Sequence, residues 1–194
     1  MIDAVLMQMA AQLNQHFRRH YPLVEDVVVV SNLQDVQGGQ IDSAENKLVI
    51  FLSSIERDTA AHRSGTVGRA MQPGIAGTLR GTEPVYLNLL VMCAANFNGP
   101  RYPEALKFLS SAIAFFQSRP IFDRHNTLEM DTRIERFVLN IENLDTNQMH
   151  SLWSIHGSHY LPSVLYRVRL VNLDGDSVMG RDPSIRDLDV GVSS

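Results

Sequence analysis

The chain has 194 residues, of which 44% are apolar, 20% are charged and 7% are aromatic. This length fits one domain, and the apolar fraction lies close to the globular norm of about 45–50%, which excludes wholesale disorder. The 17 Lys and Arg against 21 Asp and Glu give a formal net charge of −4. Such a balance argues against sequence-independent binding to nucleic acid, because that affinity comes from phosphate neutralisation by Lys and Arg. No uncharged run reaches the roughly 20 residues that cross a bilayer, so no membrane partner is predicted.

Hydrophobic periodicity predicts three helices. The first covers residues 2–18, where apolar side chains recur at spacings of three and four. The second covers 103–118 and begins with Pro103, a residue suited to the first helical position. The third covers about 147–156 and ends before Gly157.

Five segments have the composition and alternation of β-strands. They cover residues 27–30, 47–55, 85–95, 134–142 and 164–173. Residues 47–55 carry apolar side chains on both faces, which indicates burial on both sides, whereas Arg167 and Arg169 are expected to point outward from the last strand. Strands outnumber helices and do not strictly alternate with them. This order predicts an α+β fold, with a mixed, mainly antiparallel sheet of about five strands and about three helices packed on it.

The connection 57–82 has no sustained period and is rich in glycine. Structureless connections longer than about 12–15 residues are uncommon in compact domains and tend to be functional or disordered. Its four arginines, against a single acid, are Arg57, Arg63, Arg69 and Arg80. One interpretation is a solvated, flexible excursion. The other is an arm that orders on an acidic partner surface, since the guanidinium fork suits carboxylates.

The C-terminal part carries a second candidate contact. We expect one domain over residues 1–174, including the basic connection, and a tail at 175–194 that is flexible or docks on a neighbour. The stretch from Asp174 to the end holds five aspartates but also spaced apolar residues. Three of these, Ile185, Leu188 and Val190, are suited to adding a strand to a neighbouring sheet edge.

Sequence motifs for catalysis are weak. The chain has no phosphate-binding glycine loop and no nucleophile elbow. Three imidazoles, those of His150, His156 and His159, form a candidate zinc set, but Gly157 interrupts the helix between them, and no metal or cofactor is predicted. The single cysteine, Cys93, lies in an apolar run and is expected to be a buried thiol. A histidine-based metal hydrolase therefore stays a remote alternative.

Several stretches taken in order resemble a known family. They are PVYLNLLV at 84–91, YPEALKFLSSAIAFFQ at 102–117, PIF at 120–122, NLD at 143–145, LW at 152–153 and YLPSVLYRVR at 160–169. Together they resemble the N-terminal domain of the tail-terminator (cap) proteins of phage-tail-like contractile injection systems, of the antifeeding-prophage and Photorhabdus virulence-cassette type. The resemblance covers most of the chain, from Met1 to about Asp174.

This resemblance implies a structural subunit rather than an enzyme. Family members form a ring, typically sixfold, at the distal end of the tube and sheath, and they stop polymerisation there. The implied partners are copies of the same chain in a homohexamer, together with tube and sheath subunits. Assembly is expected in the cytoplasm, as part of a particle that can be released. Larger members carry a further C-terminal region, and no family role transfers to the connection 57–82.

Two hypotheses about contacts follow. The arginines of the connection 57–82 are expected to project toward the tube or sheath end, and the tail is expected to latch onto an adjacent chain. The alternative function is a soluble adaptor or assembly chaperone of such a particle, which never enters it.

Overall fold

A six-stranded sheet forms the centre of the protein. The computed structural model describes residues 1–35, 37–58, 79–81, 86–127, 130–131, 134–156, 159–172 and 178–181. The strands of the sheet are β1 (Val28–Val30), β2 (Lys47–Arg57), β4 (Leu87–Asn96), β5 (Ile121–Asp123), β6 (Ile134–Glu142) and β7 (Ser163–Asn172). Their order across the sheet is β1-β2-β4-β7-β6-β5, and every neighbouring pair is antiparallel except β1 and β2. The predicted α+β class with a mixed, mainly antiparallel sheet is confirmed, and β5 is the additional strand.

A second sheet pairs β3 (Leu79–Gly81) with β8 (Val178–Arg181) in antiparallel register. Neither strand was expected, since β3 falls within the connection 57–82 and β8 within the tail 175–194. Strand β2 also runs two residues beyond its predicted end, to Arg57. Strands β3 and β8 are short and lack an apolar alternation. They are therefore defined as strands by their pairing with each other and not by their local sequence.

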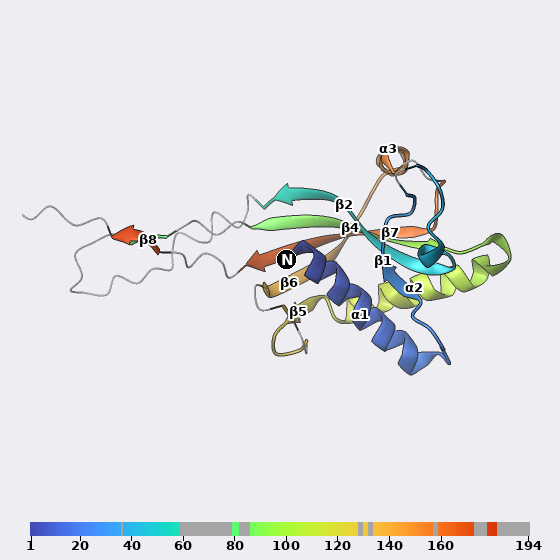
Figure 1. Ribbon diagram of the computed structural model, residues 1–194, viewed down its shortest axis with the longest axis horizontal. Coiled ribbons are helices and arrows are strands. Elements are labelled where there is room, and N and C mark those ends of the chain that lie inside the picture. Colours follow the sequence, from blue (N-terminus) through green and yellow to red (C-terminus); the bar gives the residue numbers. More distant parts are fainter. Residues whose placement is uncertain are drawn as a thin grey trace, which may run out of the picture.

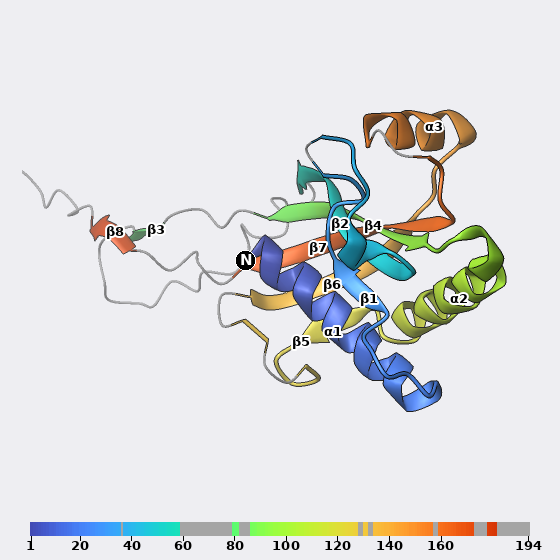
Figure 2. The same cartoon turned by 45° about the vertical axis from the view of Figure 1, so that its right-hand side comes forward.

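Three helices flank the six-stranded sheet, as predicted: α1 (Ile2–His20), α2 (Tyr102–Ser118) and α3 (Thr146–Ile155). In Figures 1 and 2, α1 and α2 lie over one face of the sheet and α3 lies beyond the other face. Helix α3 begins with a capping box, in which the Asp145 carboxylate accepts from the Gln148 N–H while the Gln148 side chain accepts from the Asp145 N–H.

Both faces of the sheet are buried by apolar packing. Leu48 and Ile50 of β2 belong to the larger core, which lies under α1 and α2. Val49 and Phe51 point the other way and pack with Trp153 of α3 in a smaller core. The predicted burial of this strand on both sides is therefore confirmed.

Asparagine side chains close the two outer strands. On β1, the Asn14 amide donates to the Val28 carbonyl and accepts from the Val28 N–H, both at 2.9 Å. On β5, the Asn126 amide donates to the Ile121 carbonyl and accepts from the Asp123 N–H, both at 3.0 Å. Backbone groups that an outer strand leaves unpaired invite pairing with other chains, and here these amides bind them.

Candidate functional site

A charged cluster crosses the sheet on the face opposite α1 and α2. The guanidinium of Arg167 on β7 binds Glu142 on β6 through two hydrogen bonds, Nε–Oε2 at 2.8 Å and Nη2–Oε1 at 3.1 Å. Its third contact, Nη1–Oε2 at 2.5 Å, reaches over β4 to Glu56 on β2. The hydrogen bonds from Arg167 lower the pKa of the Glu142 carboxyl below its ordinary value. One arginine thus connects three strands, and its predicted outward orientation is confirmed.

A second ion pair lies at the end of β2. The Arg169 Nε is 2.9 Å from the Asp58 carboxylate, which is almost completely buried, and the Asp58 N–H donates to the Tyr86 carbonyl. Arg57, just before Asp58, has an exposed side chain. The end of β2 is therefore fixed against β7, with Arg57 at the surface beside it.

The arginine cluster predicts a specific acid response. We expect Arg167→Met to lower the free energy of unfolding by about 1–2 kcal/mol at pH 7, because a bidentate, partly buried charge pair is lost. A carboxyl whose pKa falls on folding stabilises the fold above its unfolded pKa, and this contribution disappears as pH drops through the folded value. The difference between wild type and variant should therefore shrink as the pH falls below the ordinary pKa of a glutamate, about 4.3, and it is lost once Glu142 is protonated in the folded chain. Urea unfolding of both proteins at pH 7 and at pH 3 measures this difference in the free energy of unfolding.

The control for this comparison is Arg136→Met, which removes an exposed arginine from β6. We expect it to change the unfolding free energy by less than about 0.5 kcal/mol at either pH. An Arg167→Met loss that is equal at pH 7 and pH 3 would contradict the coupling between Arg167 and Glu142.

The structure places only some of the predicted contact residues. Arg57 ends β2 in the six-stranded sheet, whereas Arg80 lies in β3 of the two-stranded sheet. The other predicted contact residues of the connection 57–82 and of the tail lie outside the described residues, and they are Arg63, Arg69, Ile185, Leu188 and Val190.

The candidate zinc histidines do not converge. His156 ends α3 with its ring edge-on to Phe51 at a centroid distance of 4.8 Å, and burial lowers the pKa of His156. His150 and His159 are exposed. The described part of the chain contains no group of three or more His, Cys, Asp or Glu side chains placed to hold a metal ion. Cys93 is buried, as predicted, and burial raises the pKa of its thiol to about 12.

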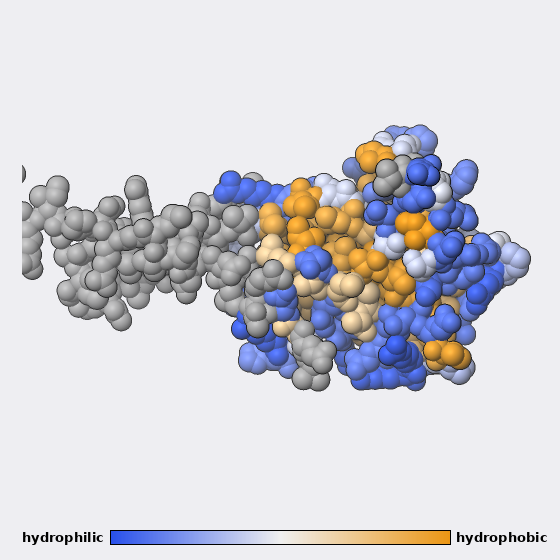
Figure 3. Space-filling model, in the orientation of Figure 1, coloured by the Kyte–Doolittle hydropathy of each residue, from blue (hydrophilic) through white to orange (hydrophobic). Residues whose placement is uncertain are grey.

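Apolar surface gathers where the N-terminal half of α1 crosses β2 and β4 (Figure 3). The partly exposed apolar side chains of these elements include Met1, Ile2, Leu52, Ile55 and Leu87. Contiguous apolar surface of this kind is typical of contacts between proteins. Among the described residues, no helix has the length and apolar character to cross a membrane.

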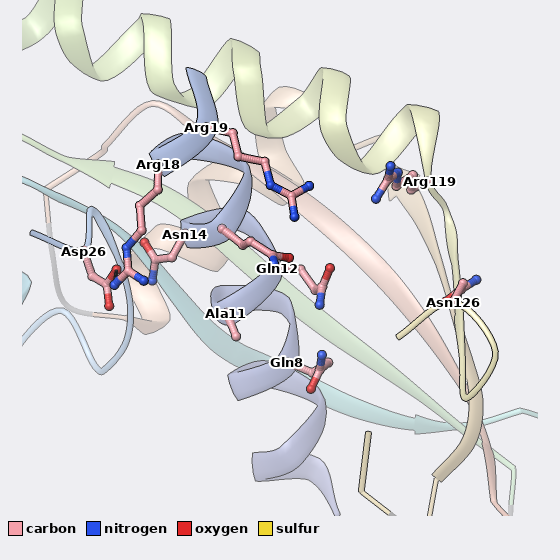
Figure 4. Close-up of a pocket in the computed structure, with 10 residues that line it drawn as sticks. Gln8, Ala11, Gln12, Asn14, Arg18, Arg19, Asp26, Arg119 and Asn126 are labelled. Carbon is pink, nitrogen blue, oxygen red and sulfur yellow. Dashed lines mark hydrogen bonds and ion pairs between the residues drawn. The ribbon is translucent and has the colours of Figure 1, made fainter. Parts of the chain in front are cut away.

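A polar groove runs between α1 and β5. We call it the α1–β5 groove; its main cavity has a volume of about 610 Å³. Figure 4 shows Gln8, Gln12 and Arg19 extending from α1 toward the strip where Arg119 and Asn126 lie. Sequence reasoning missed this groove, because its walls come from segments about 100 residues apart. The only local signal was the row of glutamines on the polar face of α1.

Two solved structures share this fold. One is a cryo-EM structure of the anti-feeding prophage cap (AFP tube terminating cap), with a TM-score of 0.50, 15% identity, and coverage of 94% of this chain and 58% of that chain. The other is a PVC sheath/tube terminator in the extended state, from an extracellular contractile injection system. Its TM-score is 0.52 and its identity 17%, with coverage of 100% of this chain and 64% of that chain. The fold is thus that of the terminator class, and the chain spans about three fifths of the length of these proteins.

The family assignment is more specific. The model of the Pvc16 N-terminal domain matches residues 4–187, which include the connection 57–82 and part of the tail. The chain belongs to the Pvc16 N-terminal domain family, and the resemblance expected from the sequence is confirmed. No curated protein sequence matches the chain.

Proposed function

We propose that the protein is a structural subunit of the ring that ends tube and sheath polymerisation in a contractile injection particle. The observation that carries this proposal is the family match over residues 4–187, together with a fold shared with two terminators of such particles. The ring is proposed to be a homohexamer that assembles in the cytoplasm and leaves with the particle.

The surface chemistry supports a ring of identical copies. A closed ring uses a heterologous contact, in which two different patches of each subunit meet. Stable contacts of this kind bury on the order of 1,200–2,000 Å². The apolar surface around Ile55 and Leu87 and the charged face around Arg167 lie on opposite sides of the sheet and differ in character. A heterologous contact does not require a patch that matches itself, so such unlike surfaces are compatible with a ring.

Two sets of residues are proposed to contact partners. The first set is expected to face tube or sheath subunits, and it consists of Arg57, Arg63, Arg69 and Arg80. The exposed position of Arg57 at the end of β2 is compatible with this role. The second set is expected to bind a neighbouring copy, and it consists of Ile185, Leu188 and Val190.

Electron microscopy of particles from a strain that lacks this protein tests the function. We expect tubes and sheaths of irregular length without a terminal ring, and restoration of capped particles when the full chain is supplied. A variant chain without residues 60–78 still contains β3. It should be present as folded protein but should not restore capping. Capped particles of normal length in the deletion strain would contradict the proposal. Capped particles that form only when this protein is expressed, but that do not contain it after purification, would favour the adaptor alternative.

A further inference from the structure

The α1–β5 groove extends beyond its main cavity. Two adjoining cavities of about 470 and 230 Å³ are lined by Gln12 and Arg119, which also line the main cavity. One wall is the polar face of α1. The other wall is the segment that leaves α2 at Arg119 and the turn that holds Asn126 (Figure 4). The three cavities share Gln12 and Arg119, so they adjoin one another, and together we call them the trough.

The trough carries positive charge from two directions. Arg19 from the last turn of α1 and Arg119 after α2 both line it, and in the described part of the chain neither is paired with a carboxylate. Arg18 turns to the other side of α1, where its Nη2 binds Asp26 at 2.6 Å (Figure 4). Among the described residues, the one carboxylate that lines the main cavity is that of Asp26, and it is therefore already engaged. Two guanidinium groups across a trough suit a ligand with two carboxylates.

The trough is apolar at one end. Pro120, Ile121 and Phe122 line the adjoining cavity beside Arg119, and Ile121 is 44% exposed. A fitting ligand therefore carries carboxylates and branched apolar side chains in close succession.

The chain itself contains such a segment. Residues 187–190 read Asp-Leu-Asp-Val, and in an extended segment alternate side chains point to opposite sides. Asp187 and Asp189 then lie on one side of the segment, while Leu188 and Val190 lie on the other. The stretch 174–194 is acidic as a whole, with five aspartates against two arginines.

The geometry favours the segment of another copy. Strand β8 ends at Arg181, and the six residues from there to Asp187 span at most about 21 Å. In Figures 1 and 2, β8 lies beyond the N-terminal end of α1, on the side away from the C-terminal end of that helix. A helix of 19 residues is about 28 Å long, so the chain's own segment would have to run fully extended along the whole of α1 to reach Arg19.

We propose that the α1–β5 groove binds residues 187–190 of a neighbouring copy, with the two aspartates held by Arg19 and Arg119 and the apolar side chains against Ile121. This rests on the proposed ring, which requires each copy to present both a binding surface and its complement. The contact lies between identical chains but joins two different patches, as a closed ring demands.

Histidines beside the trough provide a second readout. The pKa of His16 is lowered by burial and by the positive charges of His20, Arg119 and Arg19. The α2 side chains against His16 are uncharged, and they are Ser111 and Phe115. A bound carboxylate offsets the repulsion and favours protonated His16, so the segment should bind more tightly at pH 6 than at pH 8, with uptake of protons.

A labelled peptide of residues 182–194 tests the groove directly. Its binding to the full-length chain at low protein concentration is followed by fluorescence anisotropy in 50 mM salt. We expect Arg19→Glu or Arg119→Glu to raise the Kd about tenfold or more, as should a peptide with Asp187→Asn and Asp189→Asn. The charge-matched control Arg136→Glu, on the opposite sheet face, should leave the Kd unchanged. A peptide with Asp187→Lys and Asp189→Lys should bind the chain that carries both Arg→Glu changes.

The outcomes separate this inference from the proposed function. If the peptide fails to bind, or binds equally well without its aspartates, while particles still carry terminal rings of this protein, the inference is wrong and the function stands. Particles capped normally without the protein, together with tight binding of the wild-type peptide, would overturn the function and leave the groove assignment intact. Self-association of the chain that does not change when residues 187–190 are altered would also overturn the inference.

Discussion

Replacing Phe17 with alanine is expected to lower the free energy of unfolding by about 3–5 kcal/mol. Its side chain is completely buried in the larger core and connects α1 to α2. Its ring lies 5.3 Å from that of Phe108 on α2 and 5.9 Å from that of Tyr21 after α1, measured between centroids. Alanine therefore leaves a cavity at the point where both helices meet the sheet, and close-packed neighbours fill such a cavity only in part.

Urea unfolding followed by circular dichroism measures this loss. The matched control is Met7→Ala, which shortens an apolar side chain on the same helix that is 62% exposed. We expect the control to change the unfolding free energy by less than about 0.5 kcal/mol. A loss below about 1 kcal/mol for Phe17→Ala would mean that α1 does not depend on this contact.

Replacing Asn14 with alanine is expected to lower the free energy of unfolding by about 2–3 kcal/mol. The change removes both hydrogen bonds to Val28, and that residue is only 2% exposed, so solvent does not readily replace the lost partner. Alanine favours the helix more than asparagine does, which offsets less than about 0.7 kcal/mol of the loss. Hydrogen exchange should show faster exchange of the Val28 amide, with little change at the amides of β7.

For the Asn14 variant, Gln15→Ala serves as the control, because Gln15 is the exposed neighbour on the same helix. Its unfolding free energy should stay within about 0.5 kcal/mol of wild type. If the two variants lose equal stability, or if the Val28 amide remains protected in Asn14→Ala, the amide of Asn14 does not hold β1 in place.

The sequence predicts the long elements well and the short ones poorly. Strong periodicity locates α1 and α2 within two residues of their observed bounds, and burial on both faces of β2 follows from its uninterrupted apolar run. Strand β5, with three residues, carries no such period, and it is defined by its pairing with β6. Its edge is completed by a side chain from the following turn, an arrangement that local pattern does not encode.

The candidate surfaces divide in the same way. The outward position of Arg167 is visible in the alternation of its strand, but its two acidic partners depend on the register across β4, β6 and β7. The α1–β5 groove depends on tertiary placement, because Arg19 and Arg119 are brought together only when α1 and α2 pack on the same face. Family resemblance, by contrast, rests on the order of several fragments, and it could therefore be recognised before the fold was known.

The asparagines on the outer strands limit pairing between copies of the chain at the two edges of the sheet. A strand that arrives at β1 or β5 must first displace an amide that already satisfies the backbone, so it replaces hydrogen bonds instead of adding them. Copies that collide edge to edge at these positions consequently gain little and separate again. For the ring proposed above, free subunits would then not seed an open-ended sheet, and their association would be left to side-chain surfaces that a closed ring uses up.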